Sequence, residues 1–335
     1  MTNGPKPRVA VSRRLPAAVE ARMATLFDVQ FNASDDQLSP DDLIAACEDK
    51  DVLVSSITDR LDGALIARLP KSVRLIAQFG NGFDNIDIEA AYAAGLMVTN
   101  TPSVLTEDTA DMAVMLMLAL PRRLLEGADV LLRDGQWPGW SPNWMLGRRL
   151  RGKALGIVGM GRIGTAVATR ARALGLNIHY FSRARRAPAL EERLGARYWE
   201  SLDAMIGEID IVSLHTPYTR DTFHILGAGR IAALKHDAFV LNVSRSELVD
   251  EEALVAAIER GHLSGAALDV FEGPGINPRL LALARQQKII LTPHMASATL
   301  EARLEMGETV IVNVRAFFDS GQPPHRVLPE GRRGR

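Results

Sequence analysis

The sequence predicts an α/β protein of two domains, each a parallel sheet flanked by helices, with a cleft between them. Three observations support this prediction. Short apolar strands alternate with helices along most of the chain, which is the pattern of parallel sheets. The 335 residues are more than one ordinary core accommodates. In mid-chain, a glycine-rich turn lies between an apolar strand and a helix, as in doubly wound α/β domains.

The first hundred residues alternate between the two kinds of element. Apolar runs predict the strands, and segments rich in alanine and leucine predict the helices between them. The predicted strands are 8–12, 51–56, 72–79 and 95–100, and the predicted helices are 16–27, 39–49 and 86–95.

A long apolar helix is expected within 101–123, and its residues Met112 and Met115 are expected to pack in the core. Residues 131–152 carry three of the four tryptophans between glycines and prolines, which favours a connecting arm.

The second half of the chain repeats the alternation and ends in one long helix over 297–321. If the middle of the chain is one domain, the first domain is completed by the C-terminal helix. The chain then crosses between domains twice. The predicted strands are 154–158, 177–181, 196–199, 209–215, 238–244, 264–270 and 288–294. The predicted domains are 1–101 with 291–335, and 102–290.

The glycine-rich turn is Gly159, Gly161 and Gly164 in the pattern G-x-G-x-x-G. The first glycine permits a tight turn, the second lets a pyrophosphate approach the backbone, and the third lets helix and strand pack closely. The helix that follows directs its free N–H groups at the phosphates. This context predicts a dinucleotide site.

Composition narrows the class of protein. Lys and Arg total 39 and Asp and Glu total 40, so no global basic field favours nucleic acid or a membrane. Cys47 is the single cysteine, which excludes an internal disulfide and a cysteine metal cluster, and no metal is expected. The N-terminus has no apolar signal stretch and no segment is long enough to span a bilayer, so we expect a cytoplasmic protein.

Seven motifs together resemble the D-isomer-specific 2-hydroxyacid dehydrogenases, and among them the glyoxylate/hydroxypyruvate reductases. The resemblance spans nearly the whole chain. It implies two Rossmann-like domains with the active site between them, usually in a homodimer. The motifs are FGNGFDNID (79–87), TPSVLTEDTADMA (101–113), VGMGRIG (158–164), SLHTPYTRDT (213–222), NVSRSELVDEEAL (242–254), GAALDVFEG (265–273) and TPHMASAT (292–299).

The resemblance implies the catalytic residues. Arg245 and His294 each follow a predicted strand at its carboxyl end, where open α/β sheets bind ligands. Arg245 would grip the carboxylate and carbonyl of a 2-oxo acid, and His294 would protonate the new alkoxide. The backbone N–H groups of Asn81 and Gly82 would hold the substrate carboxylate as an anion nest. Trp140 matches an arm residue that reaches a neighbouring subunit's site in a relative; burial in a dimer interface alone is the alternative.

The resemblance also implies a set of cofactor-binding positions. Asp269 would lie near the nicotinamide amide, although a helix-capping or ion-pair role is the alternative. The set is Thr109, Gly159, Gly161, Arg162, Ile163, Gly164, Ser182, Arg183, Arg185, His215, Thr216, Pro217, Val243, Ser244, Asp269, His294 and Ala296.

The end of the second strand of the nucleotide domain predicts which cofactor is bound. NAD-selective relatives carry an acidic residue there, which bonds the ribose hydroxyls. Here the position is Ser182, followed by Arg183, Arg185 and Arg186. Arginines without a carboxylate would accept a 2′-phosphate, so the sequence predicts NADPH over NADH. A solvated basic loop is the alternative.

The chain departs from the family at the glutamate that keeps the catalytic histidine protonated. The family pattern D-V-F-E-x-E-P is one residue short here, and the glutamate's place falls on Gly273 or Pro274. Glu272 either takes over that role, or the enzyme works without it, or the protein is inactive. No carboxylate partner and no metal-ligand spacing are expected for the other histidines, which are His215, His224, His236, His262 and His325.

These observations predict an NADPH-preferring reductase of glyoxylate, hydroxypyruvate or a similar small 2-oxo acid. One alternative is a dehydrogenase for a larger 2-oxo acid or phosphoglycerate. Another is a binding protein that senses NAD(P).

Overall fold

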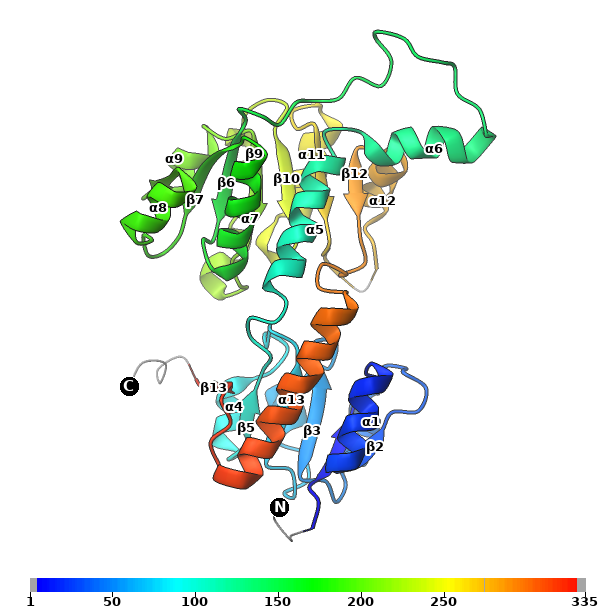
Figure 1. Cartoon of the computed structure of the whole chain (residues 1–335), viewed down its shortest axis with the longest axis vertical. Helices are drawn as coiled ribbons and strands as arrows, with labels where there is room; N and C mark the ends of the chain where they lie inside the picture. The colour runs from blue at the N-terminus through cyan, green and yellow to red at the C-terminus, as the bar shows by residue number, and fades with distance from the viewer. Residues whose placement is uncertain (1–4, 274, 330–335) are drawn as a thin grey trace. The chain divides into compact units, whose positions relative to one another are not determined.

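The computed structural model describes residues 5–273 and 275–329. The chain forms two compact units, shown in Figure 1 and described here one at a time. Unit 1 runs to Leu105 and resumes at Ala298, and unit 2 covers Thr106–Ser297. Residues 291–297, assigned by sequence to the first domain, lie with unit 2 because their backbone is hydrogen-bonded to the end of a unit 2 strand.

Unit 1 is built on a six-stranded sheet with the strand order β13-β5-β4-β3-β1-β2. The first five strands of the chain are parallel, and β13 pairs antiparallel with β5. The strands are β1 (Arg8–Val11), β2 (Asp28–Phe31), β3 (Val52–Ser56), β4 (Leu75–Phe79), β5 (Met97–Thr99) and β13 (Arg326–Val327).

Helices cover both faces of this sheet. Alternate residues of β1 point into different clusters: Val9 and Val11 pack with α1 and α13, whereas Ala10 packs with the helices of the other face. The helices are α1 (Ala17–Leu26), α2 (Pro40–Ala46), α3 (Gly63–Ile66), α4 (Ile88–Ala93) and α13 (Leu300–Ser320).

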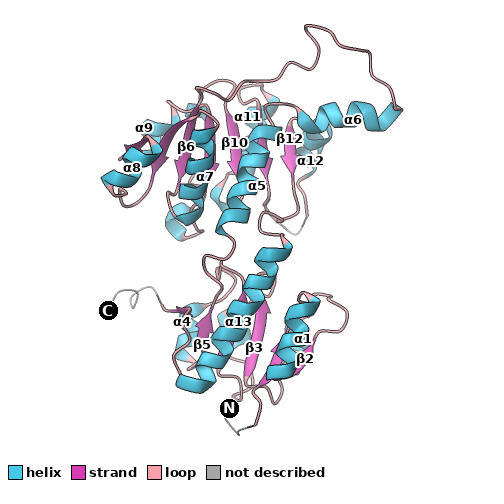
Figure 2. Ribbon diagram, viewed as in Figure 1, coloured by secondary structure: helices cyan, strands magenta, loops and turns pink. Residues whose placement is uncertain are grey.

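Unit 2 contains a seven-stranded parallel sheet with the order β12-β11-β10-β9-β6-β7-β8. Because every strand runs the same way, all carboxyl ends lie at one edge (Figure 2). The strands are β6 (Ala154–Val158), β7 (Asn177–Phe181), β8 (Ala196–Trp199), β9 (Ile211–Leu214), β10 (Phe239–Asn242), β11 (Gly265–Leu268) and β12 (Ile289–Leu291).

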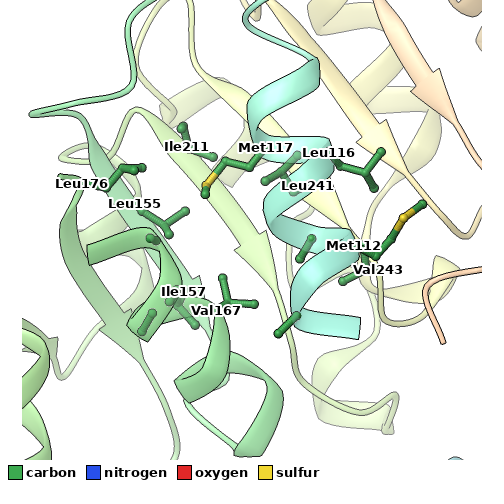
Figure 3. Packing of buried hydrophobic residues seen from close by; sticks show 14 of the residues in the cluster. Met112, Leu116, Met117, Leu155, Ile157, Val167, Leu176, Ile211, Leu241 and Val243 are labelled. Carbon is green, nitrogen blue, oxygen red and sulfur yellow. The ribbon is translucent and has the colours of Figure 1, made fainter. Parts of the chain in front are cut away.

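Two helical layers enclose the unit 2 sheet. Figure 3 shows one layer, in which Met112, Leu116 and Met117 of α5 meet Leu155 and other strand residues. The opposite face packs α9 to α12. The helices are α5 (Thr106–Ala119), α6 (Leu124–Asp134), α7 (Arg162–Ala173), α8 (Pro188–Leu194), α9 (Leu202–Ile206), α10 (Ala228–Ala233), α11 (Glu251–Glu259) and α12 (Pro278–Arg285), with short 3₁₀ turns at Arg220–Thr222 and Ser246–Leu248.

The predicted alternation and the predicted α/β fold are confirmed, with local differences. The sequence analysis missed β2, β13 and α3, which are short or at an edge, and α6, whose last residues fall in the predicted arm. Met115, predicted to be in the core, is 51% exposed because it faces away from the sheet, whereas Met112 is buried. No helix in the described part of the chain is long and apolar enough to cross a membrane.

Candidate active site

The glycine-rich turn connects β6 to α7, and each glycine has a separate steric reason. Gly159 has φ +98°, and a Cβ there would lie 2.7 Å from the carbonyl oxygen of His215. A Cβ on Gly164 would lie 2.2 Å from the Gly159 carbonyl oxygen, so only glycine lets α7 pack this close. A Cβ on Gly161 would meet nothing within 4 Å, which leaves open space beside the backbone. This arrangement fits the approach of a pyrophosphate to the first turn of α7.

Neighbouring strands hold this turn in place. The N–H of Gly159 donates to the Phe181 carbonyl at 2.9 Å, and the N–H of Met160 donates to the hydroxyl of Ser182 at 2.9 Å. Ser182 is buried at the end of β7, so the residue predicted to determine cofactor preference also supports the glycine-rich turn. Ile163 packs against the hydrophobic core, and Arg162 is exposed at the start of α7.

The loop after β7 carries three arginines that differ in their contacts. Arg185 forms a two-oxygen ion pair with Glu191, and its guanidinium lies 5.5 Å from the ring centre of Tyr198. Arg183 is exposed and forms no ion pair with any residue that the structure describes. The Nε of Arg186 is buried without a hydrogen-bond partner among those same residues.

Tyr180 on β7 holds this loop through two hydrogen bonds of its hydroxyl. Its buried hydroxyl donates to Glu191 at 2.5 Å and accepts from the backbone N–H of Arg186 at 2.9 Å. Burial and the Glu191 carboxylate raise the pKa of Tyr180 to about 12, so the hydroxyl stays a donor. Among the three arginines, Arg185 is thus held by Glu191, whereas Arg183 and Arg186 have no ion pair within the described residues.

The carboxyl ends of β9 and β10 lie in the middle of the carboxyl-end edge of the unit 2 sheet. The Nε2 of His215 lies 2.8 Å from the Ser213 hydroxyl, its Nδ1 is buried without a partner in the described residues, and burial lowers the pKa of His215 to about 4. The hydroxyl of Ser244 donates to the Thr216 carbonyl at 2.7 Å, joining the two loops. His215 is therefore neutral at physiological pH and contributes shape rather than charge.

Arg245 begins the loop after β10. The side-chain amide of Asn242 donates to the Arg245 carbonyl at 2.8 Å, and its oxygen accepts from the N–H of Ser244 at 3.1 Å. The guanidinium of Arg245 donates from Nη1 to the Ser244 carbonyl at 2.9 Å. Buried Asn242 thus sets the backbone from which Arg245 projects.

His294 lies in the loop after β12, in a backbone conformation that is uncommon for a residue other than glycine, with φ +52°. Buried Asp269, at the end of β11, stabilises this conformation. Its carboxylate accepts hydrogen bonds from the hydroxyl of Thr292 and the N–H groups of Met295 and Ala296 at 2.6–2.9 Å, and its carbonyl accepts from the N–H of His294. Strain held in this way is typical of functional sites.

Arg245 and His294 therefore follow strands that flank β11. With neighbouring strands about 4.8 Å apart, the backbones at the ends of β10 and β12 are separated by about 10 Å. Long side chains from both can reach a small molecule lying over β11. The glycine-rich turn opens at the same edge, on β6.

In unit 1, the loop after β4 is oriented by its carbonyl groups. The carbonyl of Gly80 accepts from the N–H of Thr101 at 3.0 Å, and that of Asn81 accepts from the side chain of Asn100 at 2.7 Å. In a trans peptide the next N–H points the opposite way. The N–H groups of Asn81 and Gly82 thus point away from these partners, and neither donates a backbone hydrogen bond within the described chain. Two free, adjacent N–H groups can hold a carboxylate.

Comparison with known proteins agrees with this construction. Residues 114–296 match the family description "D-isomer specific 2-hydroxyacid dehydrogenase, NAD binding domain". A glyoxylate reductase of Thermococcus litoralis is 41% identical over 327 residues, which are 96% of this chain and 97% of that protein. The chain belongs to the D-isomer-specific 2-hydroxyacid dehydrogenases. It is an NAD(P)-dependent oxidoreductase.

Two solved structures share the fold of this dehydrogenase. An NADPH-dependent glyoxylate/hydroxypyruvate reductase from Sinorhizobium meliloti, in complex with NADP and malonate, has a TM-score of 0.83 and 33% identity, covering 96% of this chain and 97% of that one. A glyoxylate reductase from Paecilomyes thermophila has a TM-score of 0.84 and 33% identity, covering 97% and 99%. The predicted family and the predicted Rossmann-like architecture are therefore confirmed.

Some predicted site residues of the dehydrogenase have contacts that sequence did not reveal. Glu272 has its Oε1 3.0 Å from the Nε2 of His224, so the prediction that His224 lacks a carboxylate partner was wrong. It was also wrong for His236, whose Nδ1 lies 3.4 Å from the Oδ1 of Asp237. The ring of Phe223 stacks on His224, with centroids 4.0 Å apart. Two residues could occupy the sequence position of the family glutamate. Gly273 has a positive φ of +81°, and Pro274 lies outside the described residues.

The remaining cofactor positions of the dehydrogenase differ in burial and in place. Thr109 is buried on α5, and Val243 is buried at the end of β10. Thr216 and Pro217 follow β9 at the same edge as the glycine-rich turn. Sequence reasoning missed Asn242 and Thr292 as supports of Arg245 and His294. Asn242 is the last residue of β10 and Thr292 directly follows β12, and this position at a strand end was the available signal.

Proposed function

We propose that this dehydrogenase reduces small 2-oxo acids, glyoxylate and hydroxypyruvate, to D-2-hydroxy acids, and that it prefers NADPH. The observation that carries the proposal is the edge of the unit 2 sheet, where Arg245 and His294 follow the strands on either side of β11 and the phosphate turn opens on β6. The curated relatives with about 40% identity are glyoxylate reductases, which supports the substrate class.

The residues would divide the work as follows. The turn from Gly159 to Gly164 and the first turn of α7 would hold the cofactor phosphates, and bound NADPH would supply the hydride. The N–H groups of Asn81 and Gly82 would bind the substrate carboxylate. Arg245 would bind carboxylate and carbonyl oxygens through its planar fork and so stabilise the developing alkoxide. His294 would then donate the proton to that oxygen.

The replacement of the family glutamate by Glu272 is a separate proposal, because the carboxylate of Glu272 contacts His224 in the structure.

The alternatives to the proposed activity are reduction of a larger 2-oxo acid, a reaction of phosphoglycerate, and a sensing role without turnover. The test is oxidation of NADPH and of NADH with a panel of 2-oxo acids of increasing size. Reduction of glyoxylate and hydroxypyruvate with a higher kcat/KM for NADPH is expected. Cofactor binding without turnover of any 2-oxo acid would favour the sensor.

We also propose that the dehydrogenase forms a homodimer through α5, α6 and the arm after α6. Figure 1 shows α6 and this arm extending away from the unit 2 sheet. Their apolar side chains are exposed, including Met115, Leu132 at 82% and Trp140 at 80%. Several large exposed apolar side chains in neighbouring segments are typical of an interaction site. A dimer mass in solution is expected, and Trp140→Ala should lower activity if the arm reaches the neighbouring site. A fully active monomer would contradict both.

A further inference from the structure

Arg303 is an arginine on the core-facing side of a helix. Helix α13 buries Met306, Gly307, Val310 and Val314, which follow Arg303 at spacings of three, four, seven and eleven residues. Residues at these spacings share one face of a helix. Arg303 therefore continues the buried stripe by one turn toward the start of α13, and its side chain is half-buried.

This guanidinium has almost no polar partner. Its one recorded contact is from Nη1 to the Sδ of Met306 at 3.5 Å, and no carboxylate in the described chain pairs with it. The residues at i±3 and i±4 are Thr299, Leu300, Met306 and Gly307, none of them acidic. Burial without a compensating charge lowers the pKa of Arg303.

Such an arrangement loses part of the hydration of the guanidinium unless an anion completes it. A buried charge normally has a partner, because desolvation without one costs several kcal/mol. Arginine offers five N–H donors in a planar fork that matches a carboxylate. The other arginines of α13 and its neighbour α1 show the contrast, since Arg315 and Arg22 are exposed and pair with Asp319 and Glu308.

The position of Arg303 in unit 1 indicates which anion. In Figure 1, α13 starts at the same end of the unit 1 sheet as the arrowhead of β3, which is the carboxyl-end edge. The anion nest is at this edge, after β4, against which α13 packs. The side chain of Asn313 on α13 donates to the Asn100 carbonyl at 3.1 Å, and Asn100 donates to the Asn81 carbonyl. These bonds hold the nest against the middle of α13, and Arg303 lies on the same helix nearer its start.

We propose that Arg303 is a substrate-binding residue that supplies a second positive charge, in addition to that of Arg245, for the carboxylate held by the N–H groups of Asn81 and Gly82. This inference rests on the proposed function and assigns a further residue to it. The nest by itself offers only neutral donors, and charge-assisted hydrogen bonds are roughly twice as strong as neutral ones.

The test measures anion binding and turnover separately. Oxalate serves as the probe, because it is a two-carbon carboxylate that cannot be reduced in this way. Its affinity for the cofactor-saturated enzyme is measured by thermal shift in wild type, Arg303→Met, Arg303→Lys and the control Arg315→Met. Arg303→Met should weaken oxalate binding and raise the KM for glyoxylate by about 10- to 100-fold, with an unchanged Kd for NADPH. Arg303→Lys should recover part of the loss, and Arg315→Met should behave as wild type.

Stability separates this role from a structural one. Since Arg303→Met removes a half-buried charge that has no carboxylate partner in the described chain, its Tm without oxalate should equal or exceed that of wild type. Wild-type oxalate affinity in Arg303→Met, or a lowered Tm with an unchanged KM, would overturn the assignment. Failure of the proposed function would appear differently, as wild-type enzyme that neither binds oxalate nor reduces a 2-oxo acid, and this result would overturn the assignment as well.

Discussion

The three arginines after β7 allow cofactor choice to be tested with a control inside the same loop. Arg185 is already bound by Glu191, through two contacts of 2.8 and 3.0 Å, and lies over Tyr198. Arg183 has no ion pair within the described residues, and the buried Nε of Arg186 has no acceptor there. Replacing each arginine in turn by Met removes the charge and keeps an unbranched stem.

The contacts determine the expected magnitudes. A hydrogen bond to a charged group contributes about 1.5–3 kcal/mol, and about 1.4 kcal/mol is a tenfold change. Arg183→Met and Arg186→Met should each raise the KM for NADPH by about 10- to 100-fold, with the exposed Arg183 at the lower end because water screens it. Arg185→Met should change this KM by less than about threefold, since Arg185 is committed to Glu191.

The assay is steady-state reduction of glyoxylate with NADPH and with NADH, each titrated at saturating glyoxylate. The KM for NADH should be nearly unchanged in all three variants, because NADH lacks the 2′-phosphate. A large loss of NADPH affinity in Arg185→Met alone would refute the reasoning from contacts. Unmodified enzyme that works better with NADH would refute the premise that this loop binds a phosphate.

Four further changes test the rest of the site. Ser182→Asp should shift preference toward NADH by about 1–3 kcal/mol, because a carboxylate repels the phosphate and bonds the ribose; an unchanged ratio of kcat/KM values would contradict this. Arg245→Lys should lose most turnover at unchanged cofactor affinity, since an ammonium cannot form the two-oxygen grip, and near-normal kcat would show that the grip is not needed. Glu272→Gln should leave the alkaline limb of reductive turnover in place, because its carboxylate contacts His224; movement of that limb to lower pH would instead assign Glu272 to the acid. Burial lowers the pKa of His215 from 6.5 to about 4, so its neutral form stabilises the fold above pH 6.5 and that contribution is lost as pH falls to about 4, at up to about 1.4 kcal/mol per pH unit; urea unfolding of His215→Gln should show a correspondingly flatter acid slope, and parallel slopes would contradict it.

Local features of the chain were readable from the sequence. The alternation of strands and helices predicted both sheets, because strand and helix periods are properties of neighbouring residues. The glycine motif predicted the turn between β6 and α7, since the strained φ of Gly159 and the close approach at Gly164 each demand a residue without Cβ. Ser182 and Arg245 could likewise be placed at strand ends, and the carboxyl ends of parallel strands share one edge.

Which partner each polar side chain takes was decided only by the tertiary structure. Glu272 and His224 are 48 residues apart, and Asp269 binds a loop more than 20 residues further on. These distances in sequence carry no periodic signal, because strand order brings the loops together. In the same way, Arg183 and Arg185 are alike in sequence, and a carboxylate on α8 makes them different.

The sequence by itself therefore determined the fold class, the phosphate turn and the strand ends that carry Arg245 and His294. The tertiary structure decided the direction of the N–H groups of Asn81 and Gly82, the support of the His294 loop by Asp269, and the half-buried, nearly unpartnered position of Arg303. The physical reason is that periodicity and steric demand act over a few residues, whereas hydrogen-bond satisfaction and burial of charge depend on neighbours that only the folded chain supplies.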